Sequence, residues 1–348
     1  MSSDVVDRPG IAAFRARLDA LRGTPAYRNY ERVRDKVLEM RATVASSSDD
    51  RPSAYWKEEL SGFEYMLDAS PLIVEKLRHH TFHVTGLHVY QYRHKRERTR
   101  ARFEKKLLAL TRVANPELLV PESPLLGGFG FEIEGRLFNL DTFKFYEVLG
   151  ALDKGAVLDE FRNTAERRLV WEIGAGWGGF PYQFKAVCPN VTYVITDFPE
   201  LFLYSATYLM TLFPDANVRF WGDAPADRFF EGWRDYDFIF MPNTSLDAMR
   251  PERLDLTINM VSFQEMTAHQ VTRYIEHAFA LECPFVYSLN REKSSYNDQI
   301  DSVHAILDKY YWPREVTMLP VSYQKMLDEE PSPHDYKHVI GWKRIKTS

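Results

Sequence analysis

Glycines and a carboxylate lie close together in one short segment of the chain. Residues 170–180 read VWEIGAGWGGF, an apolar run that leads into a glycine-rich turn. Glycine lets the backbone turn sharply and approach a ligand where a side chain would clash. The free N–H groups at the start of a following helix face the same ligand. The segment predicts a cofactor site, against the alternative of a turn that only joins a strand to a helix.

The spacing of this turn fits two classes of cofactor, and Glu172 separates them. The glycines satisfy the dinucleotide pattern G-x-G-x-x-G and, together with Glu172, the methyltransferase pattern E-x-G-x-G-x-G. A carboxylate beside the turn suits the cationic amino and sulfonium groups of S-adenosylmethionine, whereas it would repel a pyrophosphate. Asp197, after the next apolar run, can accept the ribose hydroxyls of either cofactor. Asp223, after the third run, offers a carboxylate to the adenine amino group.

The predicted cofactor is therefore S-adenosylmethionine, with S-adenosylhomocysteine as product. The predicted cofactor contacts are Glu172, Gly174, Ala175, Gly176, Trp177, Gly178, Asp197, Phe198, Asp223 and Ala224.

Methyl transfer from such a cofactor is an in-line displacement, so the protein must position the acceptor, and a hydroxyl acceptor also needs a general base. Ligands of doubly wound sheets bind beyond the carboxyl ends of the strands. Glu265 and His269 follow such an end and share a face if both lie on one helical turn, so they are the predicted bases. Alternatively, Glu265 stabilises a helix N-terminus and His269 is a surface residue. The predicted substrate contacts are Asn243, Gln264, Asn290 and Arg291.

A divalent metal is a possible but not a favoured cofactor. Metal-assisted transfer needs two or three convergent carboxylates. Glu265, Asp247 and Asp298 are available, but their spacing does not show that they converge, so no metal ligand is predicted.

The elements that must position these residues alternate between strand and helix patterns from Arg168 onward. The alternation predicts an α/β fold: a Rossmann-like, doubly wound, mostly parallel sheet with a C-terminal antiparallel hairpin, preceded by a helical N-terminal region. Residues 238–241 and 256–261 both fit the fourth strand of the sheet; we favour the second and interpret the first as an added strand. The predicted strands are 169–173, 191–195, 218–221, 238–241, 256–261, 285–289, 316–319 and 338–342.

Three regions are predicted along the chain. Residues 1–120 form a helical lid or oligomerisation region, 121–165 a connecting segment that contributes to the active site, and 166–348 the cofactor-binding domain. We expect the helical region to cover the acceptor pocket and to pair two subunits as a homodimer.

Composition limits the partners. The 348 residues carry 44 Lys and Arg against 49 Asp and Glu, so the chain lacks the overall positive charge of a nucleic-acid-binding protein. The basic run 93–102 is interpreted as a solvated helix face, with contact to an anionic acceptor as the alternative. No run of about eighteen apolar residues and no signal-peptide pattern is present, which predicts a cytoplasmic protein without a membrane partner.

Three segments carry a family resemblance: WEIGAGWGGF (171–180), TDFPE (196–200) and INMVSFQEM (258–266), with a weaker match in GFEIEGRLFNLDT (130–142). Through them the chain resembles class I S-adenosylmethionine-dependent methyltransferases, and more closely the sugar O-methyltransferases of bacterial polysaccharide and antibiotic gene clusters. The resemblance covers roughly residues 125–345. It implies that Glu172, Gly174, Gly176 and Asp197 hold the cofactor. It also implies that Gln264 and Glu265 lie at the mouth of the active site.

The function implied by the resemblance is methyl transfer to a hydroxyl of a sugar or glycosylated small molecule. The alternatives are a non-sugar natural product with an oxygen or nitrogen acceptor, an NAD(P)-dependent oxidoreductase, and a non-catalytic binding module on the same fold.

Overall fold

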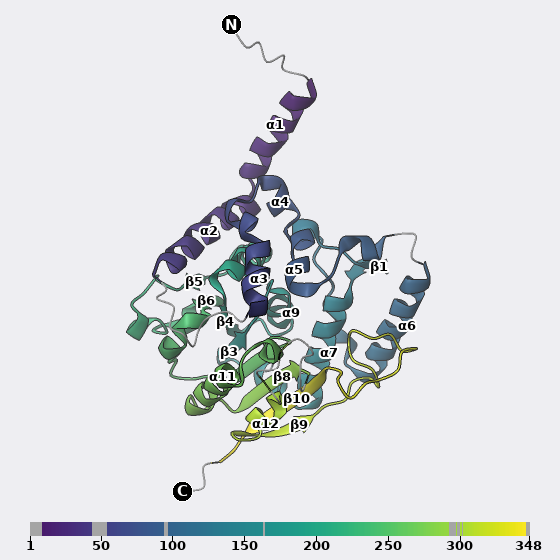
Figure 1. Ribbon diagram of the computed structural model, residues 1–348, viewed down its shortest axis with the longest axis vertical. Helices are drawn as coiled ribbons and strands as arrows, with labels where there is room; N and C mark the ends of the chain where they lie inside the picture. The colour runs from purple at the N-terminus through teal and green to yellow at the C-terminus, as the bar shows by residue number, and fades with distance from the viewer. Residues whose placement is uncertain are drawn as a thin grey trace.

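The computed structural model describes residues 9–43, 54–93, 97–162, 164–291, 297, 300 and 302–345. An eight-stranded sheet forms its centre, with the strand order β5-β6-β4-β3-β7-β8-β10-β9 (Figure 1). The strands are β3 (Arg168–Ile173), β4 (Val191–Asp197), β5 (Val218–Phe220), β6 (Phe238–Pro242), β7 (Leu256–Met260), β8 (Phe285–Asn290), β9 (Tyr311–Glu315) and β10 (Lys337–Lys343). In this spatial order, every pair of adjacent strands from β5 to β8 is parallel, whereas β10 is antiparallel to β8 and β9. The predicted mostly parallel sheet with an antiparallel C-terminal pair is confirmed.

Strand β7 pairs with β3 and β8, so the second of the two candidate fourth strands occupies that place, as expected. Strand β6 is the added one and lies between β4 and β5. The prediction of a strand at 316–319 is wrong. The strand before β10 is β9, and Met318, after it, is buried beside Gly150 of α7 (Leu140–Lys154). The Met318 side chain therefore packs against α7, and its segment does not pair in the sheet.

Helices cover both faces of the sheet, and each face has its own apolar core. On one face α7, α9 (Gly179–Val187) and α10 (Phe202–Leu212) pack on alternate strand residues such as Val170. On the other face, α11 (Ala268–Ala280) and α12 (Val303–Leu307) pack on the intervening strand residues, such as Trp171. Because side chains alternate along a strand, Glu172 lies on the same face as Val170.

The N-terminal helices are built onto the first of these faces. They are α1 (Pro9–Arg22), α2 (Pro25–Thr43), α3 (Ala54–Gly62), α4 (Pro71–Glu75), α5 (Phe82–Thr85) and α6 (Glu97–Val113). Helix α2 packs along α10, and its Tyr30, Val33 and Val37 are fully buried in the same core cluster as that helix. The N-terminal region therefore shares a core with the sheet, while α1 projects from the body (Figure 1).

Shorter elements connect these layers. Strands β1 (Phe131–Ile133) and β2 (Arg136–Phe138) pair as a small antiparallel sheet, and α8 (Asp159–Arg162) precedes β3. Short 3₁₀ helices include η3 (Leu77–His80), η4 (Val89–Tyr92), η10 (Asn243–Ala248) and η11 (Phe263–Glu265). Of the basic run, His94, Lys95 and Arg96 lie outside the described residues, and Arg100 pairs with Glu104 at 2.7 Å on an exposed face. Among the described helices, none is long and apolar enough to cross a membrane.

Candidate functional site

A cavity of about 550 Å³ lies at the carboxyl ends of β3, β4 and β7. The helical N-terminal region contributes Trp56, Glu59 and segment 82–87 to its wall, and the segment between β9 and β10 contributes Tyr323, Gln324 and Tyr336. The cavity brings together eight of the predicted residues: Glu172, Gly174, Ala175, Gly176, Trp177, Asp197, Phe198 and Glu265. A larger depression of about 760 Å³ lies between segments 221–235 and 244–252, but none of these eight residues lines it.

Positive backbone dihedrals shape the glycine turn. Gly174 has a φ of 75°, and a Cβ at this position would overlap the Ser262 hydroxyl that follows β7. Gly178 has a φ of 85° and packs against the backbone of Ser205 in α10. Gly174 therefore lets the turn pack closely on the segment after β7, whereas Gly178, which does not line the cavity, lets α9 pack beside α10.

Glu172 is fully buried in the cavity wall without a cationic hydrogen-bond partner. Its Oε2 accepts a 2.8 Å hydrogen bond from the Tyr193 hydroxyl, and its Oε1 has no hydrogen-bond partner among the described residues. Burial raises the pKa of Glu172 to about 8, although the Tyr193 bond and the charge of Lys144 lower it. A buried carboxylate with an unpartnered oxygen is costly, so a cationic ligand group would stabilise its charged form.

Asp197 connects the end of β4 to the glycine turn. Its Oδ2 accepts from the Gly176 N–H at 2.8 Å and its Oδ1 from the Phe198 N–H at 2.9 Å. Burial raises the pKa of Asp197 to about 7, and the two N–H bonds oppose that rise. Each carboxylate oxygen retains capacity for a second hydrogen bond, as vicinal hydroxyl donors require.

Glu265 and His269 do not share a helical turn, which corrects the prediction. Glu265 ends η11, and α11 begins only after Thr267, whose side chain caps it by accepting from the Gln270 N–H. The chain between them is extended at Met266, with φ −98° and ψ 167°. Glu265 lines the cavity, whereas His269 is exposed on α11 and does not line it.

The Glu265 carboxylate belongs to the wall that the N-terminal region closes. Its Oε2 accepts from the Trp56 indole N–H at 3.1 Å, and the Trp56 ring lies 5.6 Å from that of Phe198. Burial raises the pKa of Glu265 to about 8, and the nearby charges of Glu59 and Asp197 act in the same direction. A carboxylate with such a pKa has the basicity that a general base near neutral pH needs.

The structure places Asp223 away from the cavity because β6 separates β5 from β4. The Asp223 Oδ2 accepts from the Phe220 N–H at 2.7 Å, and its Oδ1 lies 3.0 Å from the ammonium of Lys36 on α2. Asp223 therefore ties α2 to the turn after β5. Neither Ala224, in that turn, nor Asn243, at the start of η10, lines the cavity.

The predicted substrate residues after β7 and β8 lie behind the cavity wall. Gln264 donates from Nε2 to the Tyr336 hydroxyl at 3.1 Å and accepts at Oε1 from the Arg291 N–H at 3.0 Å. Asn290 accepts from the Gln264 N–H at 3.4 Å. Arg291 donates to Gln324 at 3.1 Å and lies over the Tyr336 ring. This network holds Tyr336 and Gln324, which do line the cavity.

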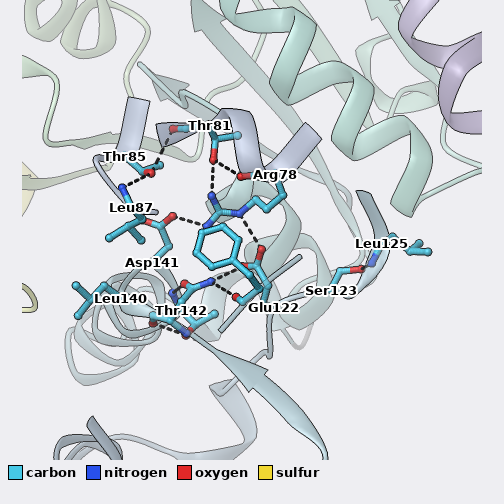
Figure 2. A network of polar contacts seen from close by, with 12 residues as sticks. Arg78, Thr81, Thr85, Leu87, Glu122, Ser123, Leu125, Leu140, Asp141 and Thr142 are labelled. Carbon is cyan, nitrogen blue, oxygen red and sulfur yellow. Dashed lines mark hydrogen bonds and ion pairs between the residues drawn. The ribbon is translucent and has the colours of Figure 1, made fainter. Parts of the chain in front are cut away.

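Sequence reasoning missed a buried ionic network under the glycine turn, centred on Arg78 of η3. Figure 2 shows the Arg78 guanidinium between Glu122 and Asp141, which its Nε and Nη2 contact at 2.7 Å and 2.6 Å. The same guanidinium lies 3.7 Å from the ring centre of Trp177. Arg78 is fully buried and so links the N-terminal region, the connecting segment and the turn. No motif marks it in the sequence.

Lys144 was also missed, although it lines the cavity one turn after Asp141 in α7. Its ammonium lies 3.3 Å from the Asp141 Oδ1, and its charge lowers the pKa of Glu172. Glu172 and Lys144 thus offer opposite charges to one end of the cavity. That pair is complementary to the ammonium and carboxylate of an amino acid, as in the methionine part of S-adenosylmethionine.

Within the described residues, no group of three or more His, Cys, Asp or Glu side chains forms a candidate metal site. Of the carboxylates considered for a metal, Asp247 lines the separate depression, and Asp298 lies outside the described residues.

No family model and no curated protein matches the chain. Among solved structures it is similar to the bifunctional kinase-methyltransferase WbdD, with 13% identity, 58% of this chain and 38% of that chain covered, and a TM-score of 0.37. An O-methyltransferase family protein from Burkholderia thailandensis matches at 13% identity, 60% and 60% coverage and a TM-score of 0.33. The N-methyltransferase NodS from Bradyrhizobium japonicum matches at 10% identity, 59% and 97% coverage and a TM-score of 0.38. The WbdD match spans less than half of that protein. TM-scores this low carry no functional assignment.

Proposed function

We propose that the protein is an S-adenosylmethionine-dependent methyltransferase whose cofactor binds in the cavity on the glycine turn. The observation that carries the proposal is Glu172, a buried carboxylate in the cavity wall with an unpartnered oxygen. Glu172 would bind the amino group of the cofactor, Lys144 its carboxylate and Asp197 its ribose hydroxyls. When bound, S-adenosylmethionine supplies a methyl group activated by its sulfonium.

The proposed acceptor is a hydroxyl of a sugar or glycosylated small molecule, and Glu265 is the proposed base. Glu265 accepts the proton that the acceptor hydroxyl loses as its oxygen is methylated. The indole N–H of Trp56 orients this carboxylate, and Trp56 and Phe198 exclude water from one side of it. The sugar assignment rests on the resemblance of the three sequence segments, and Glu265 on its place in the cavity wall.

An NAD(P)-dependent oxidoreductase fits these side chains less well. A pyrophosphate on the glycine turn would face the carboxylates of Glu172 and Asp197, with Lys144 as the only Lys or Arg among the described residues that line the cavity. Repulsion between like charges in a low-dielectric site disfavours that cofactor.

Calorimetric titration of the purified full-length protein tests the cofactor. We expect S-adenosylhomocysteine to bind and NADH not to bind. Glu172→Gln and Asp197→Asn should each weaken S-adenosylhomocysteine about tenfold or more, because each removes a charge-assisted contact. Asp223→Asn is the matched control, because Asp223 lies outside the cavity wall. A preference for NADH, or equal effects of all three substitutions, would contradict the proposal.

A further inference from the structure

Acidic side chains outnumber basic ones on the wall of the proposed active site, which bears on the charge of the acceptor. The described ionisable residues that line it, apart from histidine and tyrosine, are Glu59, Asp141, Lys144, Glu172, Asp197 and Glu265. One ammonium therefore faces five carboxylates.

Part of this excess is offset within the protein or by the proposed cofactor. Asp141 contacts both Arg78 and Lys144, and Arg78 also contacts Glu122, so these four groups form two cations against two anions. Glu172 and Asp197 are the groups assigned to the cofactor. Glu59 and Glu265 remain.

These two carboxylates line the same cavity, and neither has a cationic partner among the described residues. Glu59 lies three residues after Trp56 on α3, and the Trp56 indole N–H donates to Glu265, so both carboxylates line the cavity where α3 closes it. The charge of Glu59 raises the pKa of Glu265. Glu265 accepts from a neutral indole, and the Glu59 Oε2 lies 3.9 Å from the His83 Nδ1. Burial lowers the pKa of His83, although the charge of Glu59 acts in the opposite direction. Within the described ranges, neither carboxylate pairs with a Lys or Arg.

A series of aromatic rings next to Glu59 leads from the cavity toward the surface. Phe82 and His83 line the cavity, and their ring centres lie 3.9 Å apart. The Phe82 ring stacks on His88 at 5.1 Å, and His88 stacks on Tyr90 at 5.2 Å. Tyr90 is 50% exposed. The faces of such rings attract cations and pack against flat ligand rings.

We infer that the acceptor is an amino sugar whose protonated amino group binds between Glu59 and Glu265, beside the Phe82 ring. The inference rests on the proposed function and deepens it by naming the class of acceptor. A carboxylate or phosphate at the same place would face two uncompensated carboxylates, so uronic acids and nucleotide sugars are disfavoured. The amino group pairs mainly with Glu59, which leaves Glu265 to accept the proton of a neighbouring hydroxyl of the same ring.

Binding of matched sugars to the full-length protein saturated with S-adenosylhomocysteine tests the inference. The probes are the methyl glycosides of glucosamine, glucose and glucuronic acid, and the corresponding three galacto-configured sugars, titrated by calorimetry at moderate salt. In the configuration that binds better, we expect the amino sugar to bind about tenfold or more tightly than the neutral sugar, and the uronic acid to bind most weakly. Equal affinities, tighter binding of a neutral or acidic sugar, or no binding by any of the six would overturn the inference.

Glu59→Gln separates charge from shape. We expect this variant to bind the amino sugar only as tightly as the neutral one, with the affinities for the neutral sugar and S-adenosylhomocysteine unchanged. Glu58→Gln, an exposed neighbour on α3, is the matched control and should retain the preference. If S-adenosylhomocysteine itself fails to bind the wild-type protein, the proposed function fails. If it binds and the amino preference is absent, or persists in Glu59→Gln, only this inference fails.

Discussion

The ionisation of Glu172 makes cofactor binding depend on pH in a way that can be calculated. In the empty protein the pKa of Glu172 is about 8, because the carboxyl is buried without a cation. A cationic ligand group binds the ionised carboxylate and lowers that pKa, so binding releases a proton. The affinity for the cofactor is therefore highest well above pH 8, where Glu172 is ionised, and decreases as the pH falls below 8.

The magnitude follows from the fraction of Glu172 that is ionised. About half of a carboxyl with a pKa of about 8 is ionised at pH 8, and only about 1% at pH 6. The apparent Kd of S-adenosylhomocysteine should therefore rise roughly 50-fold between pH 8 and pH 6, which corresponds to about 2.3 kcal/mol. Asp197, with a pKa of about 7, adds to this slope below pH 7 if its carboxylate accepts the ribose hydroxyls.

Isothermal titration calorimetry at half-unit pH steps measures the effect. Repeating each titration in two buffers of different ionisation enthalpy counts the protons released, which we expect at pH 7 to be about 0.9 from Glu172 and up to about 0.5 from Asp197. In Glu172→Gln the release should fall to the part due to Asp197, and Asp197→Asn should remove that part instead. A wild-type Kd that stays constant from pH 6 to pH 8, or a slope that Glu172→Gln leaves unchanged, would refute the reasoning.

Four further predictions follow from the same geometry. Because the folded-state pKa of Glu172 exceeds its unfolded value, the free energy of unfolding of the empty protein should fall by on the order of a few kcal/mol as the pH rises from about 5 to 8. Urea melts of Glu172→Gln should show a weaker dependence of that free energy on pH. Arg78→Met leaves Glu122 buried without a cation and Asp141 with Lys144 alone, and should lower the free energy of unfolding by about 3–5 kcal/mol. The control Arg22→Met, at an exposed ion pair of α1, should lower it by less than about 1 kcal/mol. Gly174→Ala should weaken the binding of S-adenosylhomocysteine at least about tenfold, because φ is 75° at this position and the new Cβ would overlap the Ser262 hydroxyl. The control Gly10→Ala, at an exposed position of α1, should leave the Kd unchanged. Glu265→Gln should lower kcat about 10²–10⁴-fold and remove the acidic limb of the pH profile, where activity falls as Glu265 becomes protonated, whereas His269→Gln should leave kcat within about twofold; a large loss in the second variant alone would reverse the assignment of the base.

Local pattern was enough to predict the glycine turn and its carboxylates. Glu172, Gly174 and Asp197 lie within a strand–turn–helix unit and the next strand, where parallel pairing places the strand ends side by side. The same rule failed for Asp223, because it assumed that the third strand follows the second in space. The added strand β6 lies between them, and no residue near Asp223 signals this.

Pairs that depend on long separations could not be predicted. Trp56 and Glu265 are 209 residues apart, and Arg78 and Asp141 are 63 apart, yet each pair shares a hydrogen bond. The spacing of Glu265 and His269 indicated a shared helical face, but the extended backbone at Met266 puts them on different elements.

The sequence by itself determined the α/β fold, the mostly parallel sheet, and the end of the cavity that the glycine turn forms. These features depend on contacts between residues close in the chain and on the alternation of apolar side chains, which the chain displays directly. Only the tertiary structure decided which elements close the cavity and which charges meet there. The N-terminal region, anchored by the packing of α2 on α10, contributes Trp56 and Glu59 to the cavity. The segment between β9 and β10, which lies beside α6 (Figure 1), contributes Tyr323 and Tyr336. Their ionisation then depends on burial and on neighbours that no local pattern specifies.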